Sequence, residues 1–160
     1  MARHVFGDTL VKVGRDAGER GPEVEIAALV AWIVAAVAGC RLLQTWLAGG
    51  GLRGQPTKVT RYPAVLLVGH PVVAGLGLIA WVVYLATASA VYARCAFAAL
   101  VIVVLMGFVM FTRWLVGQHA GRHARGREQV FPAVAVVVHG AVAVATFVLV
   151  YLTVIAAHHP

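Results

Sequence analysis

Four long stretches of the chain carry almost no charged residues. They cover about 26–48, 63–88, 90–116 and 130–157. Each meets or exceeds the ~20 residues that a helix needs to cross a ~30 Å hydrocarbon core. Inside lipid the backbone must find its hydrogen bonds within the helix itself. The sequence therefore predicts an all-α protein, built as a four-transmembrane-helix up-and-down bundle that forms a single integral membrane domain over 1–160.

Composition and the first residues agree with this class. Hydrophobic residues make up 61% of the chain and charged residues 12%, with a mean hydropathy of +0.88, which is outside the range of soluble domains. A polar N-terminal tail over 1–22 lacks the apolar segment of a cleavable signal peptide, so we expect the first span to be retained. Pro22, followed by two acidic residues, is typical of a helix start and predicts that the first span begins there. No internal repeat stands out.

The basic residues predict the orientation of the bundle. Eight of them flank the first and third loops: Arg41, Arg53, Lys58, Arg61, Arg113, Arg122, Arg125 and Arg127. Five lie on the opposite side, four of them in the N-terminal tail. The positive-inside rule therefore favours cytoplasmic first and third loops in a bacterial inner membrane, with both termini outside. The net charge of +7 is explained by this distribution and does not indicate nucleic-acid binding.

Aromatic and cysteine residues are expected to have structural roles. Trp46, Tyr62, Trp114 and Tyr151 fall close to span ends and are predicted to be interfacial anchors. The deeper aromatic residues, Trp32, Trp81 and Tyr84, are expected to pack in the bundle. Cys40 and Cys95 belong to opposite ends of their spans, too far apart for a disulfide.

His70 and His139 are the most informative polar residues inside the spans. Each lies seven or eight residues from the start of its span, so both are expected ~10 to 12 Å below the cytoplasmic surface. In an up-and-down bundle the second and fourth helices are diagonal, and two imidazoles reaching inward leave room for one metal between them. A flat macrocycle would also need small residues beside it, which are available as Gly69, Gly75, Gly77, Gly107 and Gly140.

Arg41 is expected at the same depth as the two histidines. A guanidinium there is costly unless it snorkels or meets an anion, and beside a haem it would face a propionate, with Arg61 and Arg113 as further candidates. Two alternatives stay open. The histidines could be hydrogen-bonding contacts between helices, or they could line a proton or solute pathway. The pathway is disfavoured because no Asp or Glu lies inside a span.

The third loop is strongly basic. His119 and His123 have the i, i+4 spacing of a metal pair, but glycines and three arginines surround them. A surface for anionic lipid headgroups or for a protein partner is the better interpretation. No hydrolase, nucleotide-binding or zinc-protease motif is present.

Three segments resemble small, functionally uncharacterised four-helix membrane proteins of actinobacteria. They are 62–84 with Gly69-His70-Pro71, 111–115, and 131–149 with His139-Gly140. The placement of His70 and His139 is also similar, in architecture alone, to bacterial b-type cytochromes of the b561 and superoxide-oxidase families. That similarity implies haem b on His70 and His139. Those families usually hold two haems, whereas this chain offers one pair.

Together these patterns favour an electron-transfer protein with one bis-His haem near the cytoplasmic face, exchanging electrons with a quinone or a larger membrane complex. The alternative is a noncatalytic membrane subunit or assembly partner that uses its basic third loop as a contact surface.

Overall fold

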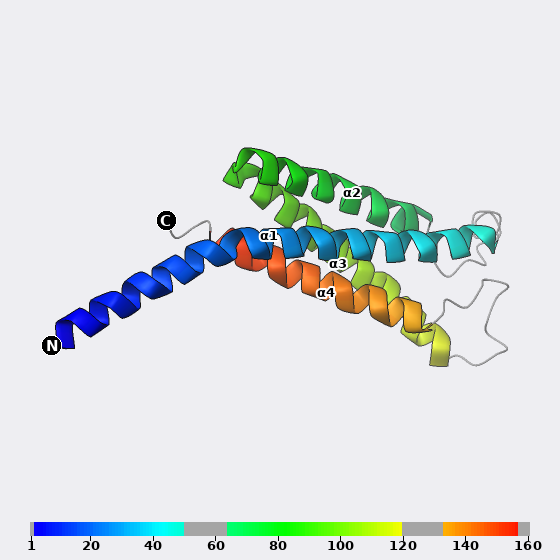
Figure 1. The fold of residues 1–160 in the computed structure, drawn as a ribbon. Coiled ribbons are helices and arrows are strands. Elements are labelled where there is room, and N and C mark those ends of the chain that lie inside the picture. The colour runs from blue at the N-terminus through cyan, green and yellow to red at the C-terminus, as the bar shows by residue number, and fades with distance from the viewer. Residues whose placement is uncertain (1, 50–63, 120–132, 157–160) are drawn as a thin grey trace.

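The protein is a bundle of four helices that run alternately up and down. The computed structural model describes residues 2–49, 64–119 and 133–156, with side chains over 21–49, 65–116 and 133–156. The helices are α1 (Ala2–Ala48), α2 (Ala64–Thr87), α3 (Ala90–His119) and α4 (Ala133–Ala156). Within these ranges there is no strand, and consecutive helices point in opposite directions (Figure 1). The predicted all-α four-helix fold is confirmed.

All four helices are long and apolar enough to cross a membrane. The qualifying segments are Gly21–Ala48, Val65–Thr87, Ala90–Val116 and Ala133–Ala156. Large apolar side chains are exposed on every helix, such as Val37, Leu76, Phe108 and Val144. Exposure of this kind around a whole bundle requires an apolar solvent. The chain is a multi-pass membrane protein, and the predicted spans agree with the helices.

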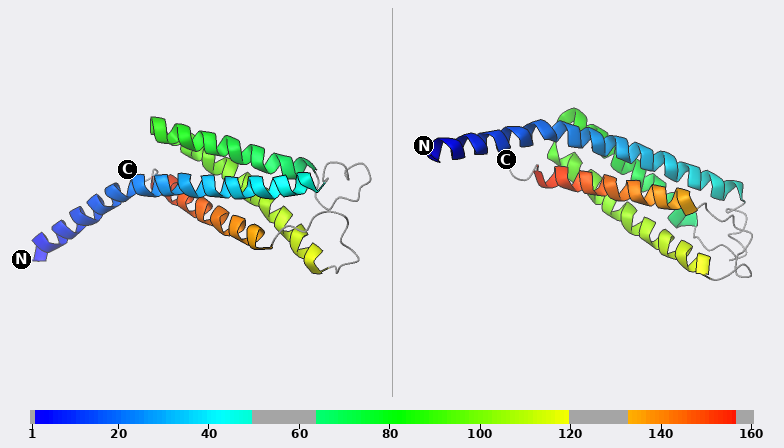
Figure 2. Two further views of the ribbon diagram at one scale, coloured as in Figure 1. Left: turned by 45° about the vertical axis from the view of Figure 1, so that its right-hand side comes forward. Right: turned by 60° about the horizontal axis from the view of Figure 1, so that its bottom comes forward.

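The start of α1 differs from the prediction. We expected the first helix to begin at Pro22, but α1 begins at Ala2 and continues through Pro22. Figures 1 and 2 show this first part of α1 extending past the other helices. A proline inside a helix leaves one carbonyl four residues earlier without its donor. Pro22 is exposed at the edge of the membrane segment, where water can satisfy that carbonyl, so the helix need not stop there.

The turn between α2 and α3 is as tight as the sequence predicts. Ala88 has a positive φ of 54°, and its backbone N–H donates to the Tyr84 carbonyl at 2.8 Å. The Thr87 hydroxyl accepts from the Ser89 backbone N–H at 3.4 Å. The segments that join α1 to α2 and α3 to α4, with Pro63 and Pro132, lie outside the described residues. We call the end of the bundle at which α1 and α3 finish the long-loop end, and the end with Ala88 the short-turn end.

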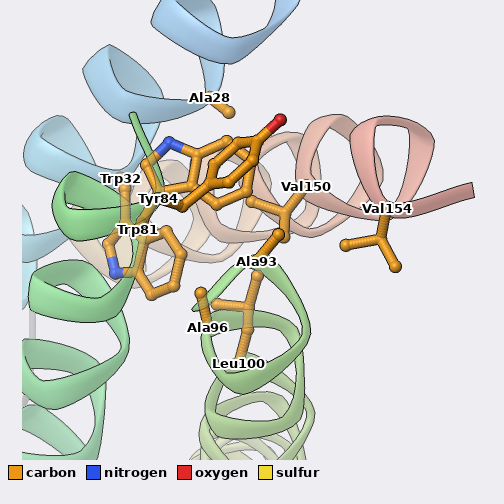
Figure 3. Close-up of a cluster of buried hydrophobic side chains, with 9 residues drawn as sticks. All are labelled: Ala28, Trp32, Trp81, Tyr84, Ala93, Ala96, Leu100, Val150 and Val154. Carbon is orange, nitrogen blue, oxygen red and sulfur yellow. The ribbon is translucent and has the colours of Figure 1, made fainter. Parts of the chain in front are cut away.

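The helices pack as two close pairs. α2 packs mainly on α3 and α1 mainly on α4, while α1–α2 and α3–α4 contacts are fewer. This arrangement places α2 and α4 on one diagonal, as predicted, and α1 and α3 on the other. A core cluster from all four helices fills the short-turn half, with Trp32, Trp81 and Tyr84 at its centre (Figure 3).

Glu25 connects α1 to α2 in this half. The Tyr84 hydroxyl donates to its carboxylate, and Trp81 Nε1 donates to its backbone carbonyl at 3.4 Å. The sequence placed Glu25 only at a helix end and gave it no partner.

A second cluster fills the long-loop half. Its buried members are Trp46 and Leu67, against which Leu43, Met110 and Trp114 pack. Trp46 is only 3% exposed, so its predicted role as an interfacial anchor is wrong. The residue lies on the α1 face that meets α2 and α3, where burial of a large apolar ring outweighs an interfacial position for its N–H group. Tyr151 is exposed, as an anchor requires, and Tyr62 lies outside the described residues.

Candidate functional site

His70 and His139 meet inside the bundle. Each lies six residues after the first residue of its helix, Ala64 in α2 and Ala133 in α4. Six residues of helix correspond to about 9 Å along the axis, so the two side chains share a depth. Their ring centroids are 6.2 Å apart, with an angle of 66° between the ring planes. The structure therefore brings together the two residues that the sequence predicted as a pair.

His139 is held by a hydrogen bond to α1. Its Nδ1 lies 3.0 Å from the carbonyl oxygen of Ala35. Because a carbonyl can only accept, Nδ1 must carry the proton in this hydrogen bond, and Nε2 then keeps a free lone pair. A backbone carbonyl in this position is the usual partner of a metal-ligating histidine, since it fixes both the tautomer and the ring orientation. His139 is thus oriented by its own surroundings with one nitrogen available.

His70 has the corresponding neighbour on α3. The backbone carbonyl of Val103 interacts with the ring, but the buried Nδ1 atom makes no hydrogen bond within the described part of the chain. A buried nitrogen without a partner costs ~1 to 3 kcal/mol, and more than nine in ten buried polar groups avoid that cost. Nδ1 is therefore the one atom of the His70 ring known to lack a hydrogen bond within the described residues.

Glycines allow the helices to approach both rings. A Cβ on Gly39 would lie 3.1 Å from His139 Cε1, and a Cβ on Gly107 would lie 3.3 Å from His70 Cε1. Both distances are shorter than ordinary van der Waals contact. Only glycine leaves space for a ring at these positions without displacing it.

The sequence identified only part of this glycine set. Gly107 was among the five expected small residues, whereas Gly39 was missed. Of the others, Gly69 lies against Met106 and Gly77 against Trp32 and Ala99, while Gly75 and Gly140 have no neighbour near their Cβ positions among the described residues.

The two half-sites share one spacing along α1 and α3. In α1, Ala35 contacts His139 through its carbonyl, Gly39 borders the ring, and Trp46 follows seven residues later. In α3, Val103, Gly107 and Trp114 have the same separations, and the first two lie beside His70. The prediction that the chain has no internal repeat therefore misses this sparse pattern. The spacing of seven between a glycine and a tryptophan, found at Gly39 and Trp46 and again at Gly107 and Trp114, was the signal that could have found it.

Of the three predicted arginines, the two that the structure describes, Arg41 and Arg113, are exposed. Arg41 is exposed, and it lies two residues from Gly39, which turns it about 200° around α1 from the face that meets His139. Arg113 is also exposed on α3. Arg61 lies outside the described residues, as do His123 and most of the basic third loop. The role of these arginines toward an anion stays a prediction.

The donor set limits which group could bind. Within the described ranges, no cluster of three or more His, Cys, Asp or Glu residues could hold a metal ion. Cys40 and Cys95 are free, and both are exposed, although a packing role was expected for them. Metal ions held by protein side chains alone usually need three or four ligands, whereas haem iron needs only one or two axial ones. With ring centroids 6.2 Å apart, His70 and His139 are the two residues that would hold such a group.

No protein-family model matches this chain, and neither a curated protein nor a solved structure matches it significantly. The resemblances drawn from the sequence therefore stay predictions.

Proposed function

We propose that the protein is a membrane electron-transfer protein that holds one b-type haem between His70 and His139. The observation that carries the proposal is the pair itself, with ring centroids 6.2 Å apart on diagonal helices. When bound, the haem would supply one-electron redox chemistry at its iron. The chain would supply two neutral imidazoles, fix one by the hydrogen bond to Ala35, and exclude water with its apolar helices.

Two further features support a cofactor over a purely structural pair. Gly39 of α1 and Gly107 of α3 border the two rings in matching positions, so both helices leave space for an imidazole ring. The Nδ1 atom of His70 has no hydrogen-bond partner in the described residues. If the histidines served only to pack the helices together, we would expect the protein to supply that partner. With the predicted orientation the pair lies near the cytoplasmic face of a bacterial inner membrane. A quinone is an electron carrier with the right solubility for such a site.

The absorbance spectrum of the purified protein tests this proposal. After expression with sufficient haem, the wild-type protein in detergent should show a Soret band with the sharp reduced bands of a six-coordinate haem. The band should be lost in His70→Ala and in His139→Ala and retained in His119→Ala, which removes a histidine from the end of α3. Added imidazole should restore it in His139→Gly if that variant is folded, because the free ligand can occupy the vacated position.

A featureless spectrum of folded wild-type protein would end the haem proposal. The competing hypothesis, a noncatalytic membrane subunit, would then be preferred. The hydrogen bond between His139 and Ala35 also suits that role, since polar contacts between helices stabilise membrane bundles. The basic third loop would be its surface for a partner or for anionic lipid headgroups.

A further inference from the structure

Two buried indole N–H groups in the long-loop half have no hydrogen-bond acceptor among the residues that the structure describes. The Nε1 atoms of Trp46 and Trp114 are buried and unpartnered within the described residues, and Trp46 is only 3% exposed. Both rings belong to the cluster around Leu67. An unsatisfied buried donor costs ~1 to 3 kcal/mol, so two in one small cluster call for a physical explanation.

The two indoles occupy equivalent positions relative to the histidine pair. Trp46 follows Gly39 by seven residues, and Trp114 follows Gly107 by seven, where each glycine borders one histidine ring. Seven residues are about two turns, so each tryptophan lies on the same helix face as its glycine and about 10 Å further along the axis. Because α1 and α3 run in the same direction, both tryptophans lie on the long-loop side of the pair. Both rings belong to the one cluster around Leu67, so the two donors lie in the same part of the bundle.

The missing acceptor should be an anionic oxygen. An indole N–H can only donate, so its partner must be an acceptor. Five of the six acidic residues lie within 8–25, toward the short-turn end, and the sixth, Glu128, is outside the described residues. Arg41 and Arg113 make the long-loop half basic, which favours a carboxylate or phosphate oxygen over a neutral one. A haem carries two carboxylates on one edge, and the structure offers two donors in matching positions.

We propose that the indole N–H groups of Trp46 and Trp114 each donate to one of the two carboxylates of the haem held between His70 and His139. This inference rests on the proposed haem function. It gives the bound group a direction, with its carboxylate edge toward the long-loop end. It also replaces the predicted role of Arg41, whose side chain lies on another face of α1. A phospholipid phosphate also offers an anionic oxygen. The experiment must therefore distinguish a lipid phosphate from the haem carboxylates as the acceptor.

The test compares iron protoporphyrin IX with its dimethyl ester, in which both carboxylates are blocked. Haem-free protein is titrated with each compound, and the dissociation constant is followed by the Soret band. Wild-type protein should bind the ester roughly 100-fold more weakly than the free acid. Trp46→Phe and Trp114→Phe should each raise the dissociation constant of the acid about tenfold and leave that of the ester unchanged. Trp32→Phe, in the core cluster of the short-turn half, is the matched control. It should leave the ratio of the two dissociation constants, for the acid and for the ester, as it is in the wild-type protein.

The outcomes separate this inference from the function on which it rests. If no histidine-dependent Soret band forms, the proposed function fails. If the band forms but wild-type protein binds acid and ester equally, the tryptophan proposal is overturned while haem binding stands. This arm needs no variant and is independent of whether a substitution disturbs folding. Native mass spectrometry with anionic phospholipid covers the other source. Loss of bound lipid in the tryptophan variants, with an unchanged constant for the acid, would assign the donors to a phosphate and refute the proposal.

Discussion

Replacing Gly39 by alanine should disturb the histidine pair from the α1 side. The new methyl group would lie 3.1 Å from His139 Cε1, about 0.3 Å inside the 3.4 Å at which ordinary contact begins. The ring cannot turn away freely, because its Nδ1 is bonded to the Ala35 carbonyl at 3.0 Å. Overpacking of this kind costs about 1–3 kcal/mol. Losing the hydrogen bond instead would cost about 0.5–1.5 kcal/mol.

Gly140→Ala provides the matched control. Gly140 follows His139 directly in α4, but a Cβ there meets nothing within 4 Å among the described residues. Both substitutions replace a helical glycine by alanine, so the intrinsic helix preference, about 0.5–1 kcal/mol, largely cancels in the comparison. The difference between the two variants then measures the contact with the ring.

The free energy of unfolding, from titration with a denaturing detergent in mixed micelles, is the measurement. Gly39→Ala should be about 1–3 kcal/mol less stable than Gly140→Ala. Gly107→Ala should fall between them, since its Cβ would lie 3.3 Å from His70. If Gly39→Ala and Gly140→Ala differ by less than about 0.5 kcal/mol, the argument that glycine is needed beside the ring is wrong.

Two further predictions concern the short-turn half. Removing the hydroxyl in Tyr84→Phe and the carboxylate in Glu25→Gln should give a coupling energy of about 1–2 kcal/mol in a double-mutant cycle, because the Tyr84 hydroxyl donates to Glu25. Tyr92→Phe, at a residue that is 42% exposed, is the control and should change the free energy of unfolding little. A coupling energy near zero between Tyr84 and Glu25 would exclude an energetic role for their hydrogen bond. Ala88→Gly should stabilise the protein by about 0.5–1 kcal/mol, because Ala88 has a φ of 54° that costs an L-residue more than glycine. Ala90→Gly in the first turn of α3 should instead destabilise it, and equal losses in both variants would contradict the strain argument.

The sequence predicted the level of a residue along its helix better than the direction in which its side chain points. Apolar runs fixed the spans, and the constant rise of a helix placed His70 and His139 at one level, which the structure confirms. The direction in which a side chain points depends on how each helix is rotated. In lipid all faces of a helix are apolar, so no amphipathic pattern reveals that rotation. Arg41 shows the difference, because it lies near the predicted level but on a face away from the pair.

The burial of Trp46 was missed for the same reason, whereas Trp32, Trp81 and Tyr84 pack in the bundle as predicted. Trp46 lies two residues from the end of α1, where tryptophan is usually interfacial, yet its ring packs on Leu67 of α2. The extension of α1 through Pro22 was missed for another reason. A proline inside a helix is costly where the carbonyl four residues earlier is shielded from water. Pro22 is exposed near the start of the membrane segment, where water can reach that carbonyl.

In the described part of the chain, the buried side-chain atoms without a hydrogen bond lie in one half of the bundle. In the short-turn half the side chains find partners within the protein: Tyr84 and Trp81 donate to Glu25, and Thr146 and Thr153 bond to carbonyls of their own helix. The three buried side-chain atoms without a partner in the described residues all lie toward the long-loop end: Nδ1 of His70 and Nε1 of Trp46 and Trp114. A bundle that needed polar groups only for packing would satisfy them in both halves, since a lone buried donor is equally costly at either end. This difference between the halves supports the proposal that the long-loop half binds a ligand. Because the two indole N–H groups share one spacing along α1 and α3, that ligand should present one acceptor to each of them.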